Sequence, residues 1–266
     1  MGISVDALVA RIQVNIPFPY LQAGYLEKFL RRGLNPEIGL DAYSLDHYPP
    51  QIFRRVARAF HGAGAHITVH GPFQDLAPGA LDDGVLAASR RRLRQACRYL
   101  PVFKPRALVC HLGYEARHYL WDQERWLARC AATFKELAAL ANAHRVPVML
   151  ENVYETEPEI FLQVLDRVGA PNLKVCFDAG HLLAFSTGDF PRWLKTLTPV
   201  IGHLHLHDNH GDADNHLALG TGQVPIKETL DYLAAHGRRP SVTLEPHQEG
   251  SLEPSLDYLA GIWPWD

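Results

Sequence analysis

Residues that commonly bind metal ions recur along the sequence at the ends of short apolar runs. They occur in the segments ITVHGP, LVCHLG, VMLEN, VCFDAGH, GHLHLHD and VTLEP, and in a DNH after the fifth of these. Imidazoles and carboxylates are the usual ligands of Zn²⁺ and Mn²⁺. One such histidine is most often a hydrogen-bonded structural residue, but six consecutive runs that end this way predict a divalent-metal site. The candidate ligands are His70, His111, Glu151, Asp178, His181, His205, Asp214, His216 and Glu245.

The apolar runs alternate with longer helical patterns along the whole chain. We expect strands at residues 11–15, 37–41, 65–70, 107–111, 148–151, 173–178, 201–207 and 242–245. We expect helices at residues 21–32, 51–63, 84–99, 121–143, 159–168 and 226–236. This alternation predicts an α/β fold with parallel strands, and eight strands indicate a single-domain (β/α)₈ TIM barrel over residues 1–266. A doubly wound open sheet is the alternative, but no GxGxxG turn follows the first strand.

Length, charge and composition agree with one soluble domain. The 266 residues suit such a barrel, and the formal net charge of −3 gives no general attraction to nucleic acid or acidic membranes. No run approaches the roughly 18 apolar residues of a membrane span, and the N-terminus lacks a secretion-signal pattern. The four cysteines have no CxxC spacing, which is typical of a reduced compartment. We therefore expect a cytoplasmic protein without nucleic-acid or membrane partners, and the sequence is compatible with an oligomer.

Taken together, the motifs HGP, HLG, LEN, FDAGH, GHLHLHDN, DNH followed by LGTG, and LEP resemble those of the xylose-isomerase-like barrel superfamily. The resemblance spans residues 65–247. That superfamily includes sugar and sugar-phosphate isomerases and epimerases, and the endonuclease IV type of AP endonuclease. In the epimerase branch one divalent ion, often Mn²⁺, is bound at positions that correspond to Glu151, Asp178, His205 and Glu245. In the endonuclease branch three zinc ions have nine ligands, which correspond to all nine candidates named above.

The resemblance implies an enzyme, and we favour an isomerase or epimerase that acts on a sugar, a sugar phosphate or a similar small polyol. The metal would stabilise an enediolate while Glu151 and Glu245 move the proton, with relay through His181 as an alternative. The second interpretation is a multi-zinc hydrolase of a phosphoester or phosphoribosyl-type bond. AP-site DNA is its less favoured substrate, because the loops at the active face contain no basic run.

The summed charge of the candidate carboxylate ligands limits how many metal ions the site can hold. Glu151, Asp178, Asp214 and Glu245 together carry about −4 when ionised, so one divalent ion leaves about −2 and three leave about +2. Uncompensated buried charge is unfavourable, and a positive cluster would suit phosphodiester hydrolysis. We therefore expect one to three ions of Mn²⁺ or Zn²⁺. The sequence leaves the number open.

Four polar residues next to the candidate ligands have simpler interpretations. His203 shares a strand face with His205 and is predicted to be a core histidine. His207 is predicted either to support a ligand or to lie at the rim of the barrel. Asn152 and Asp208 follow ligands in the chain, so we expect them to orient those ligands or their loops.

Three further features have alternative explanations. Gly220 and Gly222 in LGTG fit either a phosphate-binding loop or a tight turn. The arginine run at residues 90–94 falls within a predicted helix, so we interpret it as a solvated helix face rather than a nucleic-acid site. Aromatic residues in the loops after the strands are predicted to wall the substrate pocket; they are Phe18, Phe73, Tyr114, Tyr154 and Phe185.

Overall fold

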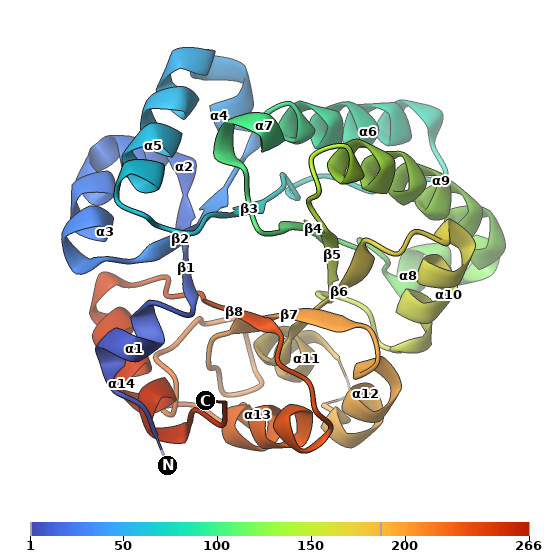
Figure 1. Ribbon diagram of the computed structural model, residues 1–266. Coiled ribbons are helices and arrows are strands. Elements are labelled where there is room, and N and C mark those ends of the chain that lie inside the picture. The colour runs from blue at the N-terminus through green and yellow to red at the C-terminus, as the bar shows by residue number, and fades with distance from the viewer. Residues whose placement is uncertain (1, 187, 266) are drawn as a thin grey trace.

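The computed structural model describes residues 2–186 and 188–265, and its eight parallel strands close into a barrel in chain order (Figure 1). Each strand pairs with its neighbours in the sequence, and β1 closes the ring by pairing with β8. The (β/α)₈ prediction is confirmed, and the open-sheet alternative is wrong. The strands are β1 (Gln13–Pro17), β2 (Asn35–Gly39), β3 (Thr68–His70), β4 (Leu108–His111), β5 (Val148–Glu151), β6 (Leu173–Asp178), β7 (Ile201–Leu206) and β8 (Ser241–Leu244).

Helices form an outer layer around the barrel (Figure 1). Near the two ends of the chain α1 lies beside α14, and the Ile3 N–H donates to the Ala260 carbonyl at 3.0 Å. The helices are α1 (Val5–Val9), α2 (Phe18–Tyr20), α3 (Leu26–Arg32), α4 (Ala42–His47), α5 (Pro50–Gly62), α6 (Asp83–Cys97), α7 (Leu100–Phe103), α8 (Ala116–Tyr119), α9 (Gln123–Asn142), α10 (Glu159–Val168), α11 (Ala179–Phe185), α12 (Phe190–Leu197), α13 (Ile226–Ala235) and α14 (Leu252–Ile262). Short π or 3₁₀ turns are η1 (Leu21–Tyr25), η2 (Leu120–Asp122) and η3 (Glu249–Ser251).

The element boundaries differ from the predicted ones where a side chain or a glycine ends an element. The predicted strand at 37–41 stops at Gly39, because Asp41 caps α4 by accepting the Ser44 N–H at 2.7 Å. The strand expected from residue 65 begins at Thr68, since the His66 N–H donates to Asn35 Oδ1 instead of to the ladder. The helix expected at 21–32 is divided, because Gly24 adopts a φ of +104°.

The register of the strands determines how far along the barrel axis each candidate ligand lies. His111 on β4 is paired with Glu151 on β5, and Asp178 on β6 is paired with His205 on β7. The apolar layer between strands and helices holds these strands in place, through fully buried side chains such as those of Phe53, Trp126 and Trp193. Each large apolar side chain buried in this way contributes about 1.5–3 kcal/mol. Among the described residues, no helix is both long and apolar enough to cross a membrane.

Candidate metal centre

All nine predicted ligands lie together at the carboxyl ends of β3 to β8 and in the loop after β7. They fall into three groups, in each of which the potential donor atoms are within 4.8 Å of one another. Glu151 belongs to two of the groups, and the outer group also contains a residue that was not among the nine, His207. We name these the first group (His70, His111, Glu151), the central group (Glu151, Asp178, His205, Glu245) and the outer group (His181, His207, Asp214, His216).

The spacing of the donor atoms fits shared metal ions. Two ligands about 2.0–2.1 Å from one tetrahedral zinc ion lie roughly 3.3 Å apart. In the central group His205 Nδ1 lies 3.1 Å from Glu151 Oε1 and 3.2 Å from Glu245 Oε1. In the first group Glu151 Oε2 lies 2.9 Å from His70 Nε2 and 3.3 Å from His111 Nε2. Charged hydrogen bonds also span these distances, so the spacing permits an ion without requiring one.

Burial and neighbouring histidines set the charge of the central carboxylates. Burial alone would raise the pKa of Glu151, but the charges of His205 and His111 hold it well below its usual range. For Glu245 burial prevails over the lowering effect of His205, and its pKa is raised. Within the described residues, every ion pair of Glu151, Asp178, Asp214 and Glu245 is with a histidine. The pocket therefore has imidazoles, not lysines or arginines, around its carboxylates.

Glu37 on β2 lies behind His205, on the side of the ring away from the central group. The sequence analysis did not assign this carboxylate to the site. It is fully buried, and its Oε1 lies 2.9 Å from Nε2 of His205, the ring nitrogen opposite the one that faces Glu151. Thr243 Oγ1 donates to its other oxygen at 2.8 Å. A carboxylate behind a histidine ligand orients the ring and makes it a stronger donor. The only signal in the sequence was a charged residue inside an apolar strand.

His203 and His207 have different surroundings although they share a strand face. His203 is buried and its two ring nitrogens contact the hydroxyls of Ser241 and Thr243 at 2.5 and 2.8 Å, so the core interpretation is confirmed. His207 is also buried, and its Nε2 lies 3.1 Å from Asp178 Oδ1. The rim alternative for His207 is therefore wrong.

Residues 35–262 match the profile of the xylose isomerase-like TIM barrel family. The chain belongs to this family. Among curated proteins it is 29% identical over 188 residues to the uncharacterized protein MJ1311 of Methanocaldococcus jannaschii, a match that covers 67% of this chain and 64% of the relative. The chain thus spans slightly less than two thirds of that relative's length. The resemblance seen in the sequence motifs is confirmed.

Solved structures with the same barrel include two proteins that are described as epimerases or epimerase-like. A D-tagatose 3-epimerase-like protein has a TM-score of 0.80 at 21% identity, over 94% of this chain and 97% of that chain. D-psicose 3-epimerase from Clostridium cellulolyticum, determined with D-tagatose, has a TM-score of 0.72 at 21% identity, over 95% and 90%. The TTHB071 protein from Thermus thermophilus, soaked with ZnCl₂, has a TM-score of 0.80 at 28% identity, over 95% and 98%.

In this xylose isomerase-like barrel, Asn152 and Asp208 orient backbone rather than facing the pocket. Asn152 accepts the N–H of Asp178 at 2.9 Å and donates to its carbonyl at 2.8 Å, which fixes the end of β6. Asp208 Oδ2 accepts the N–H groups of Gly220 and Gly222, each at 2.9 Å. Both predictions of an orienting role agree with these contacts. The two glycine N–H groups are used within the loop, so the tight-turn interpretation of LGTG is the one the structure supports.

Three of the five predicted wall residues adjoin the candidate centre. Phe73, about half exposed, stacks on the His111 ring with centroids 4.3 Å apart. Phe185 lies 5.7 Å from the His181 ring, and Tyr154 lies 5.0 Å from Phe185. The prediction is wrong for the other two, because they are buried in the core. Phe18 stacks on Phe53 at 4.3 Å, and Tyr114 meets Trp126 edge-on at 4.7 Å.

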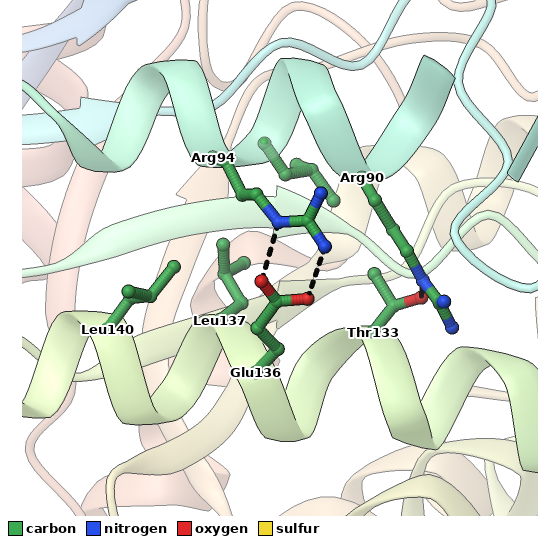
Figure 2. Close-up of a pocket in the computed structure, with 7 residues that line it drawn as sticks. Arg90, Arg94, Thr133, Glu136, Leu137 and Leu140 are labelled. Carbon is green, nitrogen blue, oxygen red and sulfur yellow. Dashed lines mark hydrogen bonds and ion pairs between the residues drawn. The ribbon is translucent and has the colours of Figure 1, made fainter. Parts of the chain in front are cut away.

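The arginine run lies on α6, on the outside of the barrel and away from the candidate centre. Arg94 donates from Nε and one terminal nitrogen to the two carboxylate oxygens of Glu136 on α9, at 2.5 and 2.8 Å, and Figure 2 shows this pair and Arg90 directed at Thr133. Arg92 is paired in the same way with Asp46, at 2.5 and 2.7 Å. The run is therefore an outer helix face, as predicted, and three of its side chains join α6 to neighbouring elements.

Proposed function

We propose that the protein is a divalent-metal-dependent isomerase or epimerase that acts on a sugar, a sugar phosphate or a similar small polyol. The observation that carries the proposal is the central group, in which two glutamates, one aspartate and one histidine converge at the carboxyl end of the barrel. Active sites of such barrels lie at this end. The sugar epimerases among the structurally similar proteins support the substrate class.

The residues of the central group fit Mn²⁺ or Zn²⁺. Three carboxylates and one imidazole are hard or borderline donors of the kind both ions accept. Asp178 is fully buried, yet its Oδ2 has no hydrogen-bond partner among the described residues, while its Oδ1 accepts the His181 N–H at 2.7 Å. An unpartnered buried carboxylate oxygen is unfavourable unless something else, such as a cation, binds it.

The chain's own residues provide the parts that proton transfer needs. A bound divalent ion would supply Lewis-acid polarisation of a carbonyl oxygen and its neighbouring hydroxyl. Glu151 and Glu245 leave β5 and β8 on either side of His205, and we assign them the removal and return of the proton. His181 Nδ1 lies 3.3 Å from Glu151 Oε1, close enough to relay a proton to that carboxylate. Phe73 and Phe185 would limit access of water to the bound substrate.

A specific observation keeps multi-metal hydrolysis as a second candidate. Glu151 uses one oxygen in the first group and the other in the central group. A carboxylate shared in this way can bridge two ions, an arrangement typical of sites that cleave phosphoesters. The imidazole-rich surroundings would leave such a cluster positively charged once it is filled. Abasic-site DNA is the less favoured substrate of this candidate, since the arginine run lies on the outer surface and Arg92 and Arg94 are paired there with carboxylates.

Isotope labelling distinguishes isomerisation or epimerisation from phosphoester hydrolysis. The metal-loaded protein should be incubated with a panel of ketoses, aldoses and their phosphates in D₂O. An isomerase or epimerase incorporates deuterium at a carbon next to the carbonyl, whereas a hydrolase releases phosphate that carries oxygen from ¹⁸O-labelled water. Deuterium incorporation supports the proposal. Phosphate release without any deuterium incorporation would replace it with the second candidate.

Variants of the central group connect that activity to the proposed ligands. Glu151→Gln, Asp178→Asn, His205→Ala and Glu245→Gln should each lower metal occupancy and reduce kcat/KM by more than about 100-fold, because loss of a supporting residue alone costs about 10–100-fold. Asp212→Asn, an exposed carboxylate in the loop after β7, is the matched control and should behave like the wild type. Full metal content and full turnover in any two of the four variants would refute the assignment.

A further inference from the structure

A groove in the outer helical layer lies where α4 and α5 meet the end of α6 and the start of α7. Figure 1 shows α5 beside α7 outside the barrel. The groove has a volume of about 270 Å³, slightly less than the roughly 300–1,000 Å³ of pockets that take drug-sized ligands. Its walls include Leu45, Pro50, Arg54, Arg98, Tyr99 and Val102, which are different residues from those of the candidate metal centre. The groove therefore has room for a small molecule.

The chain around this groove is basic although the whole protein is mildly acidic. Residues 47–74, which include α5, contain three arginines. Residues 84–114, which include α7 and most of α6, contain six arginines and one lysine. Neither range contains an Asp or a Glu, whereas the whole chain has 29 of these against 26 Lys and Arg. The surface that the two ranges form therefore attracts anions.

Two exposed arginines of the groove have no counter-charge in the protein. Among the residues that the structure describes, the side chains of Arg54 and Arg98 form no ion pair and no hydrogen bond, whereas Arg92 and Arg94 are both paired with carboxylates. The acidic residue within α4, Asp46, accepts hydrogen bonds from Arg92 on both of its oxygens, at 2.5 and 2.7 Å. Asp46 is therefore already neutralised, and an anion from solution is left as the partner of Arg54 and Arg98.

The hydroxyl of Tyr99 adds a neutral donor beside the two arginines. Its ring stacks on Phe53, with centroids 4.1 Å apart. Burial raises the pKa of Tyr99, while the charges of Arg54 and Arg98 act against the rise, which indicates that both guanidinium groups are near the phenol. The phenol stays protonated at neutral pH and can donate. In addition, α5 begins at Pro50 in the groove and has no acidic residue in its first turn, so its dipole adds positive potential there.

We propose that this groove binds the phosphate group of a small molecule, as a phosphomonoester or as inorganic phosphate. A guanidinium group can donate two parallel hydrogen bonds to phosphate oxygens. A phosphomonoester carries a charge of about −1.5 to −2 at pH 7, which two arginines match. Leu45, Pro50 and Val102 provide an apolar wall that an organic group can contact. Two unpaired arginines are too few for a nucleic acid, whose affinity depends on many phosphate contacts.

Isothermal titration calorimetry of the metal-loaded protein with phenyl phosphate and with inorganic phosphate tests the site without an activity assay. Arg54→Gln and Arg98→Gln should each weaken binding about 10–100-fold, because each removes hydrogen bonds between charged groups. Tyr99→Phe removes one hydrogen bond from a neutral donor and should weaken binding about 2–10-fold. Arg58→Gln on α5 and Arg91→Gln on α6 are the matched controls, since both arginines are exposed and lie outside the groove. Both controls should bind like the wild type.

The two probes distinguish the two sources of phosphate. Tighter binding of phenyl phosphate would identify a monoester, equal affinities would identify inorganic phosphate, and both results support the site. Affinities that are the same in the wild type, Arg54→Gln and Arg98→Gln would place the phosphate at the metal centre and overturn the proposal. No binding of either probe to the wild type would also overturn it.

A general polyanion surface would give a different pattern. Arg58→Gln would then lose as much affinity as Arg54→Gln, and the wild type would bind duplex DNA tightly, which would also overturn the proposal. All four replaced arginines are exposed, so the unfolding temperature of each variant should stay that of the wild type. The groove is separate from the central group, so the presence or absence of isomerase activity leaves this test unaffected.

Discussion

Glu151 lies within 3.3 Å of ring nitrogens from four histidines, and its two oxygens face different groups. Residue type and position at a strand end were sufficient to predict it as a ligand. Glu37 was not predicted as part of the site, and for His207 the sequence left open whether it supports a ligand or lies at the rim, because both roles depend on how far along the barrel axis the side chain lies. Both share a face with pocket residues, and only the closed ring shows that Glu37 lies behind His205 while His207 meets Asp214.

Glu37→Gln tests the support that this carboxylate gives to His205. Glutamine keeps the size of the side chain but removes the negative charge 2.9 Å from His205 Nε2, so we expect the affinity for the central ion to fall about 10–100-fold. Competition with a chromogenic chelator measures this without substrate. Thr243→Val, which removes the hydroxyl that donates to Glu37, should show a smaller loss in the same direction. Glu27→Gln, on the surface of α3, is the control, and an affinity for Glu37→Gln equal to that of this control would contradict the role.

At the scale of elements, the sequence predicted the strands best where an apolar run ends in a ligand. The predicted boundaries of β5 and β6 are those of the structure at both ends. The short helices α2, α4 and α11 were among those not predicted, because each lies directly or shortly after a strand and is too short to show an apolar period. Asp178 shows why: the same carboxylate ends β6, caps α11 and belongs to the central group. Loops were least predictable, as Phe18 and Tyr114 show by turning into the core.

Glu155 connects two loops beside the candidate centre and makes stability depend on pH. Its carboxylate accepts the N–H of Tyr114, after β4, at 3.0 Å and that of Val153, after β5, at 2.7 Å. Burial raises the pKa of Glu155 from 4.5 to about 7, although these hydrogen bonds lower it. A carboxyl whose pKa is raised by folding contributes stability that is complete below its unfolded pKa and is lost as pH rises through the folded one.

We therefore expect this group to lower the free energy of unfolding between pH 4.5 and about pH 7. The loss should approach about 3 kcal/mol, since each pKa unit corresponds to about 1.4 kcal/mol. Urea unfolding of the metal-free protein at pH values on either side of this window measures it. In Glu155→Gln the component should vanish, while Glu228→Gln, exposed in the first turn of α13, should follow the wild type. Parallel stability profiles for the wild type and Glu155→Gln would argue against a raised pKa.

At the scale of the whole molecule, closure of the barrel brings strand ends from residue 70 to residue 245 to one rim. The whole chain has a formal net charge of −3, and on its outer surface Arg92 and Arg94 of the arginine run are paired with carboxylates. DNA affinity depends mainly on free Lys and Arg contacts to phosphates. We expect no tight binding to duplex DNA and no incision of an abasic-site duplex. Gel-shift and nicking assays over a range of salt concentrations measure both, and salt-sensitive incision that His111→Ala abolishes would favour the hydrolase candidate.

Anomalous scattering from crystals grown with Mn²⁺ or Zn²⁺ tests the central claim most directly. Data collected on both sides of the metal absorption edge locate each ion without reference to activity. We predict one strong peak within bonding distance of Glu151, Asp178, His205 and Glu245. A metal-replete crystal in which no peak lies among the four residues of the central group would contradict the account.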